Sequence, residues 1–170
     1  LRIEYIIEQS KKQGCHIYVR LNKSTIDFLK NLPLDGIKST KNGELSQKET
    51  TGKLFINNID DIDDKVVFTI DVDRKTVEYG DEEAVNVKRS NFNFHSHPKA
   101  AYIRHGVEKA WPSNKDYAGF VQLETTIFHC VSTIEGLYII SFTPYWSKNV
   151  NKINKKFIWD KYEIDHTEPH

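Results

Sequence analysis

The sequence lacks methionine altogether and has little cysteine. Its 170 residues contain no Met, even at position 1, and only Cys15 and Cys130. Two cysteines outside any Cys-x-x-Cys pair cannot build a disulfide framework, so we expect ordinary thiols in a reducing compartment, with a single bridge as the alternative. The missing Met leads us to expect a processed product or an excised piece of a longer chain.

The sequence also lacks an excess of charge and a long apolar run. Lys+Arg and Asp+Glu both number 24, so nothing steers the chain toward nucleic acid or an anionic membrane. The longest strongly apolar run, residues 136–142, is too short to span a bilayer, and residues 1–14 show no signal-peptide pattern. We expect a cytoplasmic or nuclear protein, acting in a host cell if it comes from a virus or pathogen, with no nucleic-acid or membrane partner.

The composition that is present suits a folded α/β domain. Hydrophobic residues make up 38% and charged residues 28%, a balance typical of globular proteins. The length favours one domain over residues 1–170, with a core of about 16–162 and a loose tail at 163–170.

Hydrophobic periodicity predicts strands and helices without strict alternation, and therefore a mixed sheet flanked by helices. The predicted helices cover residues 24–32, a segment from Ser113, and residues 145–163. Residues 33–47 are predicted as a loop or hairpin, and the acidic run 57–64 as a turn. The predicted strands are residues 16–21, 49–56, 65–72, 84–97, 125–133 and 136–143, the last two forming a hairpin.

A histidine pair stands at the end of one predicted strand, in His95-Ser96-His97-Pro98. Side chains two residues apart project from the same face of a strand, so both imidazoles can reach one ion. Zn²⁺ takes such ligands at about 2.0–2.1 Å. Histidines with a surface or packing role are the alternative. His129, on another apolar strand, is predicted to be a satisfied core residue rather than a ligand.

A second motif, Ser113-x-x-Asp116, follows a proline and predicts a helix N-terminus closed by a capping box. A capped helix start also holds Asp116 in a fixed position, where its carboxylate can be a third ligand. Two histidines and one carboxylate leave a tetrahedral position open for water, which is the layout of a catalytic zinc. Such a site needs a nearby carboxylate as general base. Glu49 is the first candidate and Glu44, in a turn-like stretch, the second.

Glu49-Thr-Thr-Gly, His95-Ser96-His97-Pro98 and Ser113-x-x-Asp116, in this order, resemble the JAMM (MPN-plus) metalloproteases. The resemblance covers roughly residues 17–143 and implies a cytidine-deaminase-like architecture. It implies one Zn²⁺ per chain on His95, His97 and Asp116, with Glu49 as general base. It also implies that Ser113 steadies the oxyanion, and that the substrate is an isopeptide bond to ubiquitin or a ubiquitin-like protein. Many members of the family work inside complexes, so a protein complex is a further expected partner.

The spacer between the last two motifs departs from the family. Residues 99–112 are longer than the family pattern and contain His105. This insertion is expected beside the metal as a lid, a substrate-reading loop or a plug, and His105 is predicted to be solvated rather than a ligand. Two rival functions stay open: a non-catalytic JAMM-fold scaffold, and a zinc peptidase or amidase with a substrate other than ubiquitin.

Overall fold

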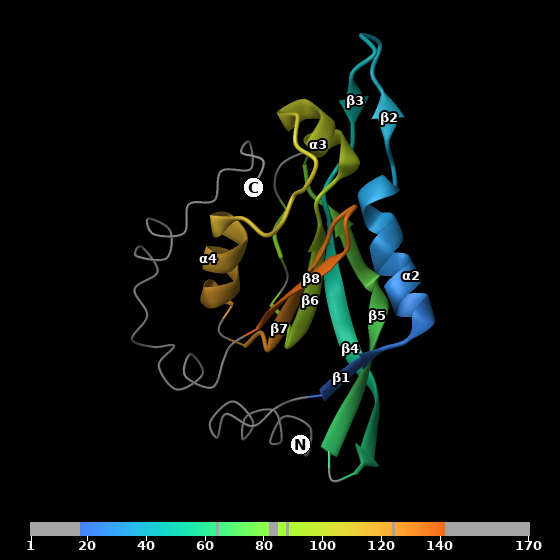
Figure 1. The fold of residues 1–170 in the computed structure, drawn as a ribbon, viewed down its shortest axis with the longest axis vertical. Coiled ribbons are helices and arrows are strands. Elements are labelled where there is room, and N and C mark those ends of the chain that lie inside the picture. The colour runs from blue at the N-terminus through green and yellow to red at the C-terminus, as the bar shows by residue number, and fades with distance from the viewer. Residues whose placement is uncertain (1–17, 64, 82–84, 88, 124, 142–170) are drawn as a thin grey trace.

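The structure is a computed structural model that describes residues 18–141 except 64, 82–84, 88 and 124. This part of the chain folds around a six-stranded sheet with three α-helices and a separate two-stranded hairpin (Figure 1). The elements in chain order are β1 (Tyr18–Leu21), α2 (Lys23–Asn31), the 3-10 turn η1 (Leu32–Leu34), β2 (Lys38–Ser39), β3 (Leu45–Ser46), β4 (Thr50–Ile62), β5 (Lys65–Tyr79), β6 (Phe92–Ser96), α3 (Lys99–His105), α4 (Asn114–Gln122), β7 (Phe128–Ser132) and β8 (Leu137–Ser141).

The large sheet is mixed, and its strand order is β1-β5-β4-β6-β7-β8. The pairs β1/β5 and β6/β7 are parallel, whereas β4/β5, β4/β6 and β7/β8 are antiparallel. The predicted α/β class with a mixed sheet is therefore confirmed, as is the β7–β8 hairpin. No helix within the described ranges is long and apolar enough to cross a membrane.

The two faces of the sheet carry different side chains, because successive strand residues point to opposite sides. Phe92 and Phe94 of β6 pack with Leu29 of α2 in the larger hydrophobic core. On the opposite face, Val131 of β7 packs with Phe120 of α4. Helices α2 and α4 accordingly lie on opposite sides of the sheet (Figure 1). The alternation directs the histidine of β6 away from α2 and toward α4.

Several predicted strand boundaries are wrong, and β5, predicted to end at residue 72, continues to Tyr79. The acidic run 57–64 does not end β4, which continues to Ile62 and pairs with β5 up to Lys65. Pairing satisfies the backbone while the acidic side chains stay at least partly in solvent, and the turn instead falls at Asp63, whose φ is 48°. Strand β6 begins at Phe92 rather than at residue 84, because both neighbouring strands start to pair with it only there.

Other predictions concern the connections. Residues 33–47 do contain a hairpin, formed by β2 and β3. The predicted insertion, residues 99–112, opens with helix α3, which ends at Gly106 in the left-handed conformation that favours glycine (φ 65°). The predicted helix 145–163 and tail 163–170 lie outside the described residues.

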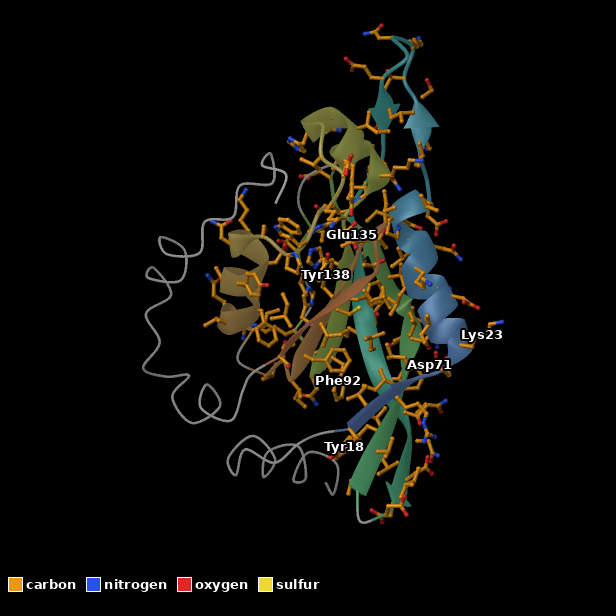
Figure 2. The ribbon with its side chains drawn as sticks, in the orientation of Figure 1. Tyr18, Lys23, Asp71, Phe92, Glu135 and Tyr138 are labelled. Atoms are coloured by element: carbon orange, nitrogen blue, oxygen red, sulfur yellow. The ribbon has the colours of Figure 1, made fainter. Side chains whose placement is uncertain are left out.

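The start of α2 is fastened to the sheet by polar groups. The Asn22 side chain accepts a hydrogen bond from the Thr25 backbone N–H (2.9 Å), as an N-cap does. The Thr25 hydroxyl donates to the Asp71 carboxylate on β5 at 2.6 Å. Figure 2 shows Asp71 beside the first turn of α2. These contacts fix the position of the Thr25 hydroxyl, and they keep the pKa of Asp71 below its ordinary value.

Candidate metal centre

Two strands and one helix bring the predicted site residues together. His95 is the fourth residue of β6, and His97 follows the strand directly, with its backbone N–H donating to Ser132 O of β7 (2.8 Å). Asp116 lies in the first turn of α4. Both histidines are buried, with exposed fractions of 3% and 8%. The sheet thus presents the imidazoles to the N-terminus of the helix that covers this face.

His95, His97 and Asp116 form a group that can hold a metal ion. The His95 Nε2 atom lies 3.1 Å from His97 Nε2 and 3.0 Å from Asp116 Oδ1, and His97 Nε2 lies 3.3 Å from Asp116 Oδ2. Atoms at two corners of a tetrahedral zinc site lie about 3.3 Å apart, given Zn–N distances of about 2.0–2.1 Å. The spacing of the three side chains therefore fits one small ion.

The Asp116 carboxylate is held by the start of its own helix. Its Oδ2 accepts hydrogen bonds from the Ser113 backbone N–H (2.6 Å) and the Ser113 hydroxyl (2.9 Å). The Asp116 N–H donates to Ser113 Oγ at 3.2 Å, which completes the predicted capping box. Oδ2 thus accepts the hydrogen bonds of the helix cap, while Oδ1 faces His95. A carboxylate placed by a cap needs little reorganisation to bind an ion.

His97 is oriented by the predicted insertion, residues 99–112. Its Nδ1 lies 2.7 Å from the Ala110 carbonyl oxygen. A carbonyl can only accept, so Nδ1 carries a proton, and in the neutral ring Nε2 keeps its lone pair toward Asp116 and His95. The Ala110 N–H in turn donates to Glu135 Oε1 at 2.8 Å. Residues 106–112 therefore support the site through the main chain.

His95 has a buried partner of its own. Its Nδ1 lies 2.5 Å from Nε2 of His129, a residue of β7, and the two rings are stacked with an interplanar angle of 17°. His129 Nδ1 lies 2.6 Å from Asn93 Oδ1, two residues before His95 on β6. The prediction that His129 is a satisfied core residue is correct as to burial, but one of its partners is a proposed ligand.

The charges of the group act on one another. Burial alone raises the pKa of Asp116, but the neighbouring His95 and His97 outweigh it and hold that pKa well below its ordinary value. For His97, burial alone lowers the pKa, but the hydrogen bond and the charge of Asp116 outweigh burial and raise it. Burial lowers the pKa of His129 well below its ordinary value, so His129 is neutral.

Glu49 lines the same cavity as the three proposed ligands, a space of about 620 Å³. Its backbone is fixed by two hydrogen bonds to residues 80–81, from Gly80 N to Glu49 O (2.9 Å) and from Glu49 N to Asp81 O (2.8 Å). Burial raises the pKa of Glu49, with His95 and His97 acting against that rise. A carboxylate with a raised pKa is a better proton acceptor. A cavity of this size also holds more than an ion, since ligand pockets span about 300–1,000 Å³.

The remaining candidates are placed as follows. Ser113 lines the cavity, but its hydroxyl is engaged with Asp116. Glu44 precedes β3 in the hairpin and is not among the residues that line the cavity. His105, at the end of α3, is exposed and lines the cavity without belonging to the group of three.

Sequence reasoning overlooked two supporting groups, Asn93 and the Ala110 carbonyl. The i and i+2 spacing of Asn93 and His95 was visible and places both on one face of β6. The Ala110 contact is made by a main-chain atom, so no pattern of side chains in the sequence predicts it.

Comparisons with models of known protein families, with curated proteins and with solved structures found no match for this chain.

Proposed function

We propose that this chain is a zinc-dependent isopeptidase of the JAMM type, which hydrolyses ubiquitin or ubiquitin-like conjugates. The observation that carries the proposal is the convergence of His95, His97 and Asp116 on one small-ion position beside Glu49. Two histidines and one carboxylate are the donor set of catalytic rather than structural zinc sites. The order of the three motifs in the sequence supports the JAMM assignment and the choice of substrate.

In this proposal, Glu49 and Ser113 have separate roles in the hydrolysis. Zinc at such a site polarises a carbonyl and makes bound water acidic, with a pKa of about 7. Glu49 takes the proton of the attacking water and passes it to the leaving amine, a role that its raised pKa suits. Ser113 holds Asp116 in place and is proposed to turn its hydroxyl toward the developing oxyanion. The cavity provides room for the conjugate's linkage beside these groups.

The test is cleavage of a panel of lysine-linked di-ubiquitins by zinc-loaded protein, with bound zinc measured in parallel. We expect Glu49→Gln to keep zinc and lose turnover, because all three ligands remain and only the base is gone. We expect His97→Ala to lose both zinc and turnover.

Each contrary outcome has a definite meaning. A fully active Glu49→Gln variant would mean that another carboxylate, with Glu44 next in order, is the base. Zinc binding without cleavage of any di-ubiquitin would remove ubiquitin from the proposal and leave a zinc peptidase or amidase. A parent protein that binds no zinc would favour the non-catalytic scaffold.

A further inference from the structure

A row of buried polar groups runs behind His95, on the side away from His97. It begins at the Ser90 carbonyl oxygen, which accepts a hydrogen bond from the Thr126 hydroxyl at 2.8 Å. Asn93 Nδ2 lies 3.3 Å from Thr126 Oγ1, and Asn93 Oδ1 lies 2.6 Å from His129 Nδ1. His129 Nε2 then lies 2.5 Å from His95 Nδ1.

The directions of these hydrogen bonds follow from the carbonyl at the start of the row. A backbone carbonyl only accepts, so the Thr126 proton points to Ser90 and Thr126 Oγ1 must accept from Asn93. The Asn93 NH₂ therefore faces Thr126, and its amide oxygen faces His129. That oxygen accepts the His129 Nδ1 proton. If the Asn93 amide were reversed, its oxygen would face Thr126 Oγ1, and neither atom would have a proton to donate to the other.

The same logic passes through His129 to the metal group. The contact with Asn93 places a proton on His129 Nδ1, so in the neutral ring the Nε2 of His129 accepts from His95. His95 must then carry its own proton on Nδ1, and His95 Nε2 keeps a lone pair. His97 reaches the same state through Ala110. When both rings are neutral, as metal binding requires, two imidazole lone pairs and the Asp116 carboxylate face one another at 3.0–3.3 Å.

We propose that His129 is a positioning residue that sets the tautomer of His95 for metal binding, under the direction of Asn93. The inference rests on the proposed zinc function. It assigns no proton transfer to His129. Hydrogen-bond partners of metal-bound histidines fix ring orientation and tautomer, and their loss typically weakens metal binding about 10–100-fold. Here the partner is itself a histidine, so its effect depends on which of its own nitrogens holds the proton.

The first test is direct and needs no metal. Long-range proton–nitrogen NMR correlations on chelator-treated protein, at a pH where the imidazoles are neutral, report which ring nitrogen is protonated. We expect His95, His97 and His129 all to carry the proton on Nδ1. A His95 with its proton on Nε2 would overturn the proposal.

The second test uses a matched pair of variants. A glutamine amide at position 129 places an oxygen near the site of the His129 Nε2 and can still accept from His95. An asparagine amide reaches only the site of Nδ1, so His129→Asn leaves His95 without its acceptor. We expect zinc affinity, measured by competition with a chromophoric chelator, to fall about 10–100-fold in His129→Asn. We expect His129→Gln to stay within a few-fold of the parent.

Equal zinc affinity in the two variants and the parent would overturn the proposal, provided that urea unfolding without metal shows all three to be folded. If His129→Asn does not fold, the NMR measurement on the parent decides by itself. The outcomes also separate the two proposals. A parent that binds no zinc contradicts the proposed function, whereas a zinc-binding parent with His95 protonated on Nε2 contradicts only the role of His129.

Discussion

Ser113 shows how one small residue serves both fold and site. Its hydroxyl and its backbone N–H both donate to Asp116 Oδ2, so the side chain that caps α4 also orients a proposed ligand. Structural and functional interpretations of Ser-x-x-Asp are therefore compatible. Their relative weight can be measured, because one substitution at position 113 can remove the hydroxyl and another can keep it.

We expect Ser113→Ala to lower the free energy of unfolding by about 1 kcal/mol, the usual cost of removing an N-cap side chain. Zinc affinity should fall as well, because Asp116 Oδ2 loses one of its two donors from Ser113. Urea unfolding without metal and a zinc competition titration measure the two effects. Ser113→Thr keeps the hydroxyl and serves as the control. Unchanged stability with lost turnover would show that Ser113 acts only on the reaction.

At the scale of elements, Gly52 of β4 pairs with Phe94 of β6 beside the site and leaves room for its ring. A Cβ at Gly52 would lie 2.6 and 2.8 Å from two ring atoms of Phe94. The Phe94 ring is fully buried and meets Phe28 edge-on at 6.0 Å, so it cannot simply rotate away. Phe94 also lies between Asn93 and His95, which makes its position important for the metal group.

Gly52→Ala should therefore lower the free energy of unfolding by about 1–3 kcal/mol, the usual cost of overpacking. Urea denaturation with a metal chelator present measures this change. The control is Gly119→Ala in α4, where a Cβ has nothing within 4 Å and a helical alanine is favoured. A Gly52→Ala variant as stable as the parent would mean that β6 can shift outward without loss.

Asp71, which connects β5 to the start of α2, gives the fold a defined response to acid. Hydrogen bonds, first that from Thr25, hold its pKa below the ordinary value, so the folded state favours the ionised carboxylate. This stability is present above the unfolded pKa of about 3.9 and is lost as pH falls through the lower folded value. Asp71→Asn should lower the melting temperature at neutral pH.

The difference in melting temperature between Asp71→Asn and the parent should shrink as the pH falls below about 4 toward the lower folded pKa of Asp71, because the parent's carboxylate is progressively protonated over that range. Asp27→Asn, on an exposed position of the same helix, is the control and should change little at any pH. A difference that is constant from pH 7 to acid would show that the ionised form of Asp71 is not what stabilises α2.

Local patterns predicted the elements that carry the ligands, but not their supports. Pro98 and the His-x-His spacing correctly predicted the end of β6, and Ser113-x-x-Asp116 correctly predicted the start of α4. The acidic run 57–64 is predicted to interrupt the strand, because local propensity does not report that β5 continues alongside residues 58–62. The contact between His129 and His95 depends on parallel pairing of β6 with β7, a long-range property that no short motif contains.

At the scale of the whole molecule, the segment 99–112 is fastened at both ends to distant parts of the chain. The buried Gln47 side chain accepts from Ala100 N (3.1 Å) and donates to the carbonyls of Pro33 and Asp35. Near the other end, Glu135 accepts from Ala110 N (2.8 Å) and from the Tyr102 hydroxyl (2.6 Å). Figure 2 shows Glu135 below α3. With these two anchors, residues 99–112 form a supported wall of the cavity.

Glu135→Ala should release Ala110 and thereby weaken the orientation of His97. We expect zinc affinity to fall by at least several-fold, within the range typical of groups that orient ligands. Tyr102→Phe removes a second donor to Glu135 but leaves the Ala110 contact, so it should reduce stability while zinc affinity stays close to the parent. Chelator competition and urea unfolding separate the two effects. Equal zinc affinity in both variants would mean that His97 holds its position without this support.

The Ala110 contact also bears on how such a protein can change over generations. Both polar atoms that Ala110 uses belong to the peptide chain, so most side chains at position 110 leave them intact, and proline is the exception because it has no N–H. Point substitutions at the exposed neighbours Glu108 and Lys109 should therefore accumulate easily, whereas Gly106 is restricted by its positive φ and Ala110 by its burial. A deletion of one residue between 106 and 110 would move the carbonyl away from His97. Related sequences should differ freely at 108 and 109 while keeping the length of the stretch constant.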